Sequence, residues 1–366
     1  MSMPEFYKSF RRTADGSSIE MKEETLPRSL PSNHVLIRIH AVSLNYRDVA
    51  MMKGKYPVQV IDRGIPASDC AAEVVTVGPD VKDFKPGDHV APTFDLNNIA
   101  GLQDDSQVLG GDVDGVLRQY AVFHQQVLVH LPEYLSWEEA ACLNCAGTTA
   151  WRALDMPQTR GTALLQGTGG VSMFALLICL AAGIQPIITS SSDKKLETAR
   201  ALGNPGAVQT INYTTHPDWD KQALHLTSGR GVDIVVDNVG PTAIAKAFSS
   251  LARGGLISLV GFLGGFNVDE QPNVLGPVLL KSARLRFVTF YQPGSLRDIL
   301  IFKKKIVRGL TPGSKHEFQA LCNFLEERKV SLKPILDSTI FSFEDSQNAF
   351  DYLYGAKHMG KVVIRI

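Results

Sequence analysis

The sequence has no excess of charge of either sign and no long hydrophobic run. Its 37 Lys and Arg residues balance 37 Asp and Glu residues, so it lacks the basic surplus that usually accompanies binding to nucleic acid or a membrane surface. The longest apolar stretch, residues 174–183, is about half of the ~20 residues that span a bilayer, and we interpret it as a buried helix. The basic run at residues 303–305 is typical of a solvated helix face. We expect no nucleic-acid and no membrane partner.

Cysteine is also scarce, and no secretory signal is visible. Five cysteines are an odd number, which is typical of reduced thiols rather than of a disulfide framework. The first residues lack the positively charged region followed by an apolar segment that a secretory signal needs. We therefore expect a cytoplasmic protein. The cysteines are Cys70, Cys142, Cys145, Cys179 and Cys322.

The length of 366 residues predicts two domains, and the pattern changes along the chain. The first third contains short β-rich runs, such as residues 35–39 and 72–77, separated by Gly- and Pro-containing turns, which is typical of an irregular β-rich domain with few helices. The last ~70 residues return to a mixed pattern and end in a predicted strand over 361–366. We expect this tail to rejoin the first domain.

From about residue 150, short apolar strands alternate with helix-length segments. Six such strands with helical crossovers predict an α/β, doubly wound parallel sheet inserted between the two parts of the first domain. The predicted strands cover residues 163–166, 186–189, 208–211, 232–236, 256–260 and 285–290, and helices are expected up to residue 182 and over 194–202 and 219–226. The predicted domains are 1–148 with 293–366, and 149–292.

A glycine-rich turn follows the first of these strands and opens a helix. In that context Gly167 permits a tight turn, and Gly169 lets the backbone approach a pyrophosphate with no Cβ in the way. The helix N-terminus adds unpaired N–H groups and the positive end of the helix dipole. Ser172 stands where the usual motif has a third glycine, a position that serves close packing of helix on strand. The turn predicts a dinucleotide-binding site.

The choice of dinucleotide depends on the residues after the second strand of this fold. An acidic residue there would bind an NAD ribose, but Ser190 occupies the position, followed by Ser191. Small hydroxyls leave room for a 2′-phosphate, to which Lys194 and Lys195 can donate charge-assisted hydrogen bonds. NADPH is favoured over NADH, although Asp193 would favour NADH if a small change in register placed it near the ribose.

Seven short motifs are spread along nearly the whole chain, at residues 45–48, 54–57, 148–151, 167–172, 189–195, 211–213 and 360–364. Taken in order, they resemble the zinc-independent, quinone-oxidoreductase-like branch of the medium-chain dehydrogenases/reductases. The resemblance implies a GroES-like β-rich catalytic domain around a central Rossmann domain, and commonly a homodimer.

Within this resemblance, the positions that bind catalytic zinc in other branches hold Asn45, Ser68 and Cys145. One remaining cysteine cannot form a site that needs three protein ligands and an open position. The region of the second family zinc, residues 94–116, contains no cysteine. We expect no metal.

The resemblance also implies further cofactor contacts. Lys195 and Tyr213 would lie at the 2′-phosphate beside Ser190 and Ser191, and Thr149 would touch the nicotinamide. Loops after the fourth and fifth strands would cover the nicotinamide, two aromatic residues would close the pocket, and a lysine from the tail would reach a phosphate. With the turn itself, the remaining implied contacts are Gly167, Thr168, Gly169, Gly170, Val171, Asn238, Val239, Gly261, Phe262, Leu263, Phe290, Tyr291 and Lys361.

Hydride transfer leaves negative charge on the acceptor, so a site without zinc needs another donor. The candidates are Asn45 and Tyr46, with Tyr46 the preferred proton donor and Tyr56, Ser68 and Asp69 as neighbours. Reduction of a C=C bond conjugated to a carbonyl, or of a quinone, needs less electrophilic help, because the charge delocalises. Reduction of an activated ketone or aldehyde needs more and stays an alternative. A structural or regulatory NADPH-binding protein without turnover is a third.

Overall fold

The computed structural model describes residues 4–56, 60–101, 105–265, 275–287, 312–356 and 358–366. The chain divides into two compact units. The terminal unit comprises Met1–Thr148 with Gly313–Ile366, and the central unit comprises Thr149–Pro312. A division after residue 148 was also predicted from the sequence, but the predicted return to the first domain was at residue 293, which lies outside the described residues, and the terminal unit resumes at Gly313. None of the described helices has the length and hydropathy of a membrane span.

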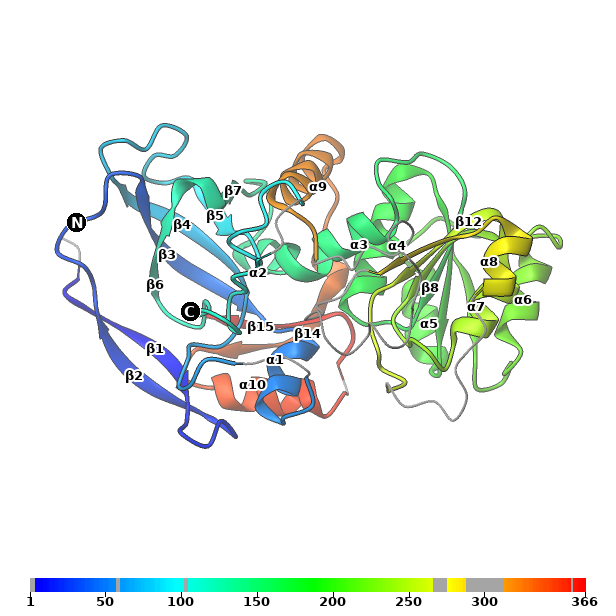
Figure 1. Cartoon of the computed structure of the whole chain (residues 1–366), viewed down its shortest axis with the longest axis horizontal. Helices are drawn as coiled ribbons and strands as arrows, with labels where there is room; N and C mark the ends of the chain where they lie inside the picture. Colours follow the sequence, from blue (N-terminus) through cyan, green and yellow to red (C-terminus); the bar gives the residue numbers. More distant parts are fainter. Residues whose placement is uncertain (1–3, 57–59, 102–104, 266–274, 288–311, 357) are drawn as a thin grey trace. The chain divides into compact units, whose positions relative to one another are not determined.

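The terminal unit is built on a seven-stranded sheet in the order β14-β15-β3-β4-β5-β7, with β6 paired to β3. A separate two-stranded sheet joins β1 and β2 antiparallel (Figure 1). The strands are β1 (Phe6–Arg12), β2 (Ile19–Thr25), β3 (His34–Ser43), β4 (Asp69–Val77), β5 (His89–Pro92), β6 (Tyr120–His124), β7 (Leu128–His130), β14 (Leu336–Ser342) and β15 (Lys361–Arg365). The helical elements are α1 (Tyr46–Met52), η1 (Gln125–Val127), α2 (Trp137–Ala141), the π-helical η2 (Leu143–Gly147), α9 (Lys315–Arg328), η3 (Lys333–Ile335) and α10 (Ser346–Tyr354).

The C-terminal strand brings the tail back to the start of the chain, as predicted. β15 pairs antiparallel with β3, so that Val363 lies opposite Ser43, and β14 adds parallel to β15 at the edge. Figure 1 shows β15 beside β3. The first four residues of β15 are buried, because both of its faces are covered, and this explains the unbroken apolar run Val362 to Ile364. Lys361, a predicted cofactor contact at the start of the strand, is thereby buried.

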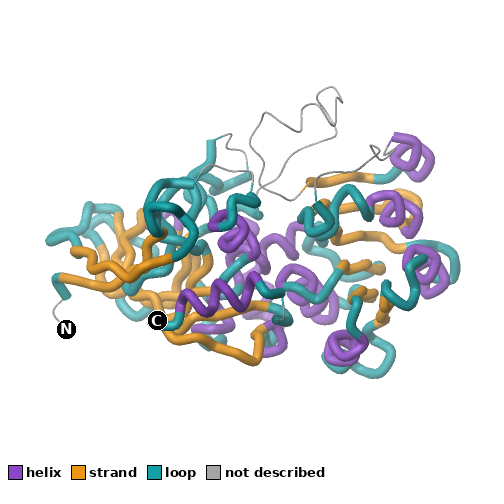
Figure 2. The backbone as a smooth tube through the Cα atoms, turned by 90° about the horizontal axis from the view of Figure 1, so that it is seen from below, coloured by secondary structure: helices purple, strands orange, loops and turns teal. Residues whose placement is uncertain are grey.

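The central unit is the predicted parallel sheet, with six strands in the order β10-β9-β8-β11-β12-β13. This order matches the doubly wound dinucleotide-binding fold, in which the strand order reverses at the first and fourth strands. Figure 2 shows helices of this unit on both sides of its strands. The strands are β8 (Thr162–Gln166), β9 (Gln185–Ser190), β10 (Gln209–Asn212), β11 (Val232–Asp237), β12 (Leu251–Leu259) and β13 (Arg284–Phe287), and the helices are α3 (Thr148–Ala153), α4 (Gly170–Ala182), α5 (Asp193–Arg200), α6 (Trp219–Leu226), α7 (Ile244–Ser250) and α8 (Leu275–Lys281).

One strand differs from its prediction, and glycine explains why. β12 begins at Leu251, five residues before the predicted start, and its register with β11 shifts after Val232 pairs with Leu251. Gly254, with φ +77°, lies in that irregularity and adopts a conformation that L side chains rarely take. A glycine pair inside a strand is easily interpreted as a turn, although here it marks a bulge.

Candidate active site

The turn between β8 and α4 is open where a phosphate group would approach. Gly167 has φ +82°, and a Cβ added there would meet nothing within 4 Å. Gly169 has an ordinary φ of −81°, and an added Cβ would again meet nothing within 4 Å. Neither backbone strain nor packing therefore requires a glycine at position 169. The residue also serves as the N-cap of α4, so no side chain caps the helix's first N–H groups.

Ser172, at the third glycine position, forms hydrogen bonds with the residues at the ends of β8 and β11. Ser172 Oγ donates to the Gln166 carbonyl oxygen at 2.8 Å and accepts from Asn238 Nδ2 at 2.9 Å. Ser172 is 1% exposed, so α4 packs against the ends of β8 and β11 through a hydroxyl instead of through the closest contact that glycine allows. Its neighbours Thr168, Gly170 and Val171 complete the predicted turn and the first residues of α4.

Four predicted contact residues gather at the carboxyl ends of β9 and β10. Ser190 ends β9, and its carbonyl oxygen accepts from the Tyr213 backbone N–H at 3.1 Å, which brings the backbone of Tyr213, an exposed residue, beside the serine. Ser191 is exposed, and Lys195 lies in the first turn of α5, where its N–H donates to the Ser192 hydroxyl at 3.4 Å. The fold thus assembles hydroxyl, phenol and ammonium groups at one edge of the sheet.

Asp193, the residue that would favour a ribose, has a partner within the protein. Its Oδ1 accepts from Asn212 Nδ2 at 2.8 Å, across the ends of β9 and β10. As the first residue of α5 it also benefits from the positive end of the helix dipole. Its carboxylate therefore has a structural function, while Ser190 retains the strand-end position that the sequence analysis assigned to it.

The loops after β11 and β12 are bonded to each other. Leu263 N donates to the Asn238 carbonyl at 3.1 Å, and Gly264 N donates to that of Val239 at 3.0 Å. A Cβ on Gly261 would lie 2.9 Å from the Asn238 oxygen, so this glycine is required by packing. Phe262 lies within the second loop, and Leu263 is 66% exposed. Thr149, at the start of α3, is buried, whereas the predicted Phe290 and Tyr291 lie outside the described residues.

A buried acid that the sequence analysis passed over holds the first of these loops. Asp237 Oδ1 accepts from the Val239 and Gly240 backbone N–H groups at 2.9 and 2.8 Å. Its side chain is fully buried, and the burial raises its pKa to about 6. A carboxylate directly after the apolar run Ile234 to Val236, at the end of the strand, was the available signal for this residue.

In the terminal unit, α1 positions the predicted donors. Asn45 is the N-cap of α1, and its backbone N–H donates to the buried Asp48 carboxylate at 2.8 Å. Tyr46 is the first residue of the helix and is 53% exposed, and its phenol makes no hydrogen bond within the described residues. Tyr56 is partly buried, and burial raises the pKa of its phenol to about 12. Tyr46 is thus the accessible phenol of the two.

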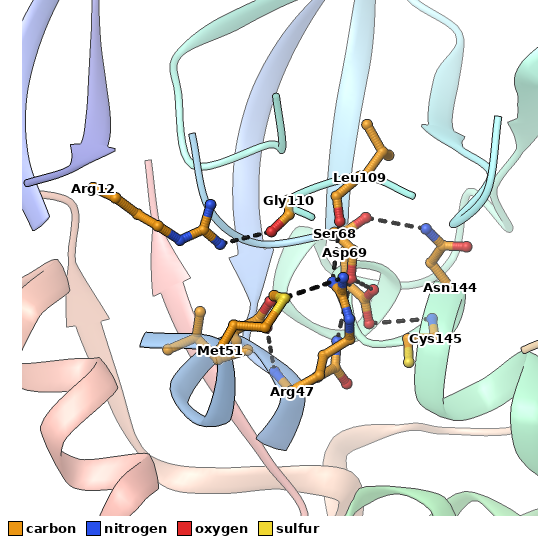
Figure 3. Close-up of polar contacts among 12 residues, drawn as sticks. Arg12, Arg47, Met51, Ser68, Asp69, Leu109, Gly110, Asn144 and Cys145 are labelled. Atoms are coloured by element: carbon orange, nitrogen blue, oxygen red, sulfur yellow. Dashed lines mark hydrogen bonds and ion pairs between the residues drawn. The ribbon is translucent and has the colours of Figure 1, made fainter. Parts of the chain in front are cut away.

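A π-helical turn brings the remaining predicted neighbours around Asp69. Asp69 Oδ1 accepts from Ser68 Oγ at 2.8 Å, and Oδ2 accepts from the Cys145 backbone N–H at 3.2 Å. Asn144 Nδ2 donates to the Ser68 carbonyl at 3.1 Å. Figure 3 shows Asn144 and Cys145 reaching these two residues from the same segment. Single π turns inside helices occur frequently at functional sites.

Two buried arginines hold the neighbouring loop. Arg47 Nη1 donates to the Leu109 carbonyl at 3.0 Å, and Arg12 Nη2 donates to the Gly110 carbonyl at 2.6 Å (Figure 3). Burial lowers the pKa of Arg12 to about 10, which leaves its guanidinium charged at neutral pH. Guanidinium groups thus order a segment of residues 94–116, the region that contains no cysteine.

Lys361 has different partners from those that the resemblance implies. Its ammonium donates to the Leu44 carbonyl at 2.9 Å and to Asn45 Oδ1 at 2.6 Å, and it lies 3.5 Å from Asp69 Oδ2. The residue is 3% exposed, so the ammonium is enclosed within the terminal unit instead of being free to reach a phosphate. Gly360 permits this placement, because its φ is +73° and an added Cβ would lie 2.0 Å from the Ile335 carbonyl oxygen.

Cys142 and Cys145 show a spacing that the sequence analysis did not use. Two residues separate them, as in metal-binding and redox pairs, yet both are free thiols. Burial raises the pKa of the Cys142 thiol to about 11 and that of Cys145 further still. Among the described residues, no group of three or more His, Cys, Asp or Glu side chains is arranged to hold a metal ion.

Comparison with known proteins agrees with this fold. Residues 31–133 match the alcohol dehydrogenase GroES-like domain family, and residues 170–327 match the zinc-binding dehydrogenase family. A zinc-type alcohol dehydrogenase-like protein of Schizosaccharomyces pombe is 34% identical over 357 residues, covering 95% of each chain.

Solved structures agree as well. A structure from Sinorhizobium meliloti 1021, described as an alcohol dehydrogenase, is 30% identical with a TM-score of 0.83 and covers all of both chains. A quinone oxidoreductase of Pseudomonas syringae shares the fold at 23% identity, with a TM-score of 0.71 and coverage of 98% of this chain and 100% of its own. The chain is therefore an oxidoreductase-type protein of the medium-chain dehydrogenase/reductase superfamily, with a GroES-like domain and a Rossmann domain.

Proposed function

We propose that the protein is an NADPH-dependent reductase that works without zinc and transfers hydride to a C=C bond conjugated to a carbonyl, or to a quinone. The observation that carries the proposal is Gly169, a residue with ordinary φ and open space around its missing Cβ. A glycine that the protein itself does not need is explained by a ligand that approaches its backbone closely. The uncapped start of α4 would bind the pyrophosphate of that ligand.

The preference for the phosphorylated dinucleotide rests on the carboxyl end of β9. Ser190 and Ser191 offer hydroxyls, Tyr213 lies beside them, and Lys195 supplies a positive charge for a 2′-phosphate. Asp193 is held by Asn212, so it is not the strand-end acid that an NAD ribose requires. Thr149 and the loops at Asn238–Val239 and Gly261–Leu263 are assigned to the nicotinamide half.

The residues at the family's catalytic metal position do not fit a zinc ion. Asn45 and Ser68 replace two of its ligands, which leaves Cys145 as the single thiol at a site that needs three protein ligands. The buried Lys361 ammonium already contacts Asn45 and Asp69, and a second cation there would be repelled. No step of the proposed reaction uses a metal.

The reaction then depends on hydrogen-bond donors of the terminal unit. A bound nicotinamide dinucleotide supplies the hydride, and the chain must stabilise the negative charge that develops on the acceptor. The Asn45 amide and the Tyr46 phenol are neutral donors, so they suit acceptors that spread the charge over an enolate or aryloxide. Tyr46 is exposed and is assigned as the proton donor.

The test is a panel of enones, quinones and activated aryl ketones, with oxidation of NADPH and of NADH followed by absorbance at equal concentrations. We expect turnover of enones or quinones, faster with NADPH, and no loss of activity after treatment with a chelator. Faster reduction of ketones would favour the carbonyl-reductase alternative. A clear preference for NADH, or stoichiometric zinc in the purified protein, would overturn the corresponding part of the proposal.

A further inference from the structure

Lys361 of the terminal unit has a buried ammonium whose hydrogen bonds and ion pair all involve oxygen atoms of residues 44, 45 and 69. Lys361 lies against the Leu44 carbonyl, Asn45 Oδ1 and Asp69 Oδ2, at 2.9, 2.6 and 3.5 Å. Its residue is 3% exposed, and Asp69 is fully buried. Enclosing a lysine charge is costly unless it is paired and hydrogen-bonded, so the placement calls for a reason.

The contacts form a closed ring of four side chains. Lys361 donates to Asn45 Oδ1, Asn45 Nδ2 donates to Ser68 Oγ at 3.5 Å, and Ser68 Oγ donates to Asp69 Oδ1 at 2.8 Å. Asp69 Oδ2 faces Lys361 and closes the ring. Because an ammonium can only donate, the group that faces it must be the amide oxygen, which fixes the Asn45 amide nitrogen on the opposite side.

Only one member of the ring reaches solvent. Lys361, Ser68 and Asp69 are buried, whereas Asn45 is partly exposed. One amide N–H of Asn45 is directed at Ser68, and the other makes no hydrogen bond within the part of the chain that the structure describes. A cation on the amide oxygen draws electron density from the nitrogen and strengthens its N–H as a donor, as expected for polarised hydrogen-bond chains.

We propose that Lys361 is a positioning residue: its buried ammonium orients and polarises the Asn45 amide, whose remaining N–H binds the oxygen of the acceptor. The positive charge that a metal would supply then acts through a neutral amide. The inference rests on the proposed function for the identity of the reaction, but the ring is a property of the terminal unit alone. This role differs from a contact with a cofactor phosphate. If Lys361 bound a phosphate, its substitution would lower the affinity for NADPH.

The first experiment separates these two roles in the full-length protein. Lys361→Met removes the charge, Lys361→Arg retains it, and Lys55→Met removes an exposed lysine that contacts Tyr354 in the same unit. We expect Lys361→Met to lower kcat about 100-fold, as for loss of an oxyanion donor, while KM for the acceptor and Kd for NADPH change by less than about threefold, well under 1 kcal/mol. Lys361→Arg should recover part of kcat, and Lys55→Met should match the wild type. A raised Kd for NADPH with unchanged kcat would overturn the inference.

The second experiment needs no turnover. Selective ¹⁵N-asparagine labelling gives the side-chain amide resonances, and Asn45→Asp identifies that of Asn45 by its loss. We expect the Asn45 amide protons to shift upfield in Lys361→Met and to stay near the wild-type position in Lys361→Arg. If the wild type binds NADPH but reduces no acceptor, the proposed function fails. The amide shift still tests whether Lys361 polarises Asn45.

Lys361→Met leaves Asp69 as a buried, unpaired charge, and that variant can unfold. The double variant Lys361→Met with Asp69→Asn removes both charges and keeps an oxygen for the Cys145 N–H. We expect it to fold, to bind NADPH as the wild type does, and to retain the low kcat and the upfield amide shift. A double variant with wild-type kcat, or with an unshifted Asn45 amide, would overturn the inference.

Discussion

In the terminal unit the charged residues Asp69 and Lys361 are buried in a hydrogen-bonded network, whereas in the central unit Gly169 of the turn before α4 and Ser191 after β9 are exposed. Asp69 and Lys361 are almost inaccessible, and each contacts other members of the same network. A Cβ added at Gly169 would meet nothing within 4 Å, and Ser191 is exposed. The groups of the first region are therefore bonded within the protein, whereas those of the second are accessible to a ligand.

The two units differ in whether folding or ligand binding provides partners for their polar groups. A buried ring needs its charges to compensate each other before any ligand arrives, so its geometry is set by folding. The N-terminus of α4 has no capping side chain, so the binding of an anion would complete it. Substitutions in the central unit should thus change binding with little effect on stability, except where packing or buried charge is involved.

The largest effect is expected at the exposed donor of the terminal unit. Tyr46→Phe removes a phenol that has no internal partner, so folding should be unchanged while kcat falls by about 10²–10³, the typical cost of a lost oxyanion donor. Steady-state kinetics and thermal unfolding measure the two effects. Tyr354→Phe, another exposed tyrosine of the unit, is the matched control. An unchanged kcat would remove Tyr46 from the mechanism.

Substituting two glycines of the central unit by alanine should have different effects, one on cofactor binding and the other on stability. Gly169→Ala places a methyl group where only a ligand would meet it, so we expect Kd for NADPH to rise about 100-fold, near 3 kcal/mol, with unchanged thermal stability. Gly261→Ala places a methyl group 2.9 Å from the Asn238 carbonyl oxygen, so it should lower stability. Calorimetric titration and thermal unfolding test both. Destabilisation by Gly169→Ala would mean that packing requires that glycine.

The buried Asp237 should make the free energy of unfolding depend on pH. The pKa of Asp237 is raised from 3.8 to about 6 by burial, so the folded protein binds a proton that the unfolded chain releases between these values. The contribution of Asp237 to the free energy of unfolding should therefore rise by about 3 kcal/mol in full as pH falls from about 7 to 4, and should be lost again as pH rises through 6. Comparing urea unfolding of the wild type and Asp237→Asn isolates the contribution. Parallel pH profiles for the two proteins would contradict it.

The smallest effect concerns cofactor choice. Lys195→Ala should weaken NADPH binding about tenfold, because one charge-assisted hydrogen bond contributes about 1.5–3 kcal/mol, and should leave NADH binding unchanged. Lys221→Ala, which removes an exposed lysine of the same unit that pairs with Asp218, is the control and should change the affinity for NADPH by less than about threefold, as a solvent-screened charge does. Equal losses for NADPH and NADH would contradict the assignment of Lys195 to the 2′-phosphate.

Much of the central unit could be predicted because its signals are local. The alternation of apolar strands and helices gave six strands within a few residues of those observed, and the Gly167–Gly169 turn lies at the predicted junction. The start of β12 was predicted too late, because Gly254 and Gly255 suggest a turn where the strand bulges. The bridging function of Ser172 and the partner of Asp193 were not visible, since both depend on residues 66 and 19 positions away.

The periodic elements, the glycine-rich turn and the residue types near α1 could be predicted from the sequence, because each depends on neighbours along the chain. The contacts of Lys361 could not, because they depend on how the chain folds. Its partners Asn45 and Asp69 lie 316 and 292 positions away, and β15 must pair with β3 before the ammonium can meet them. A buried charge is stable only where the fold brings its counter-groups together, so its function follows from packing rather than from a motif.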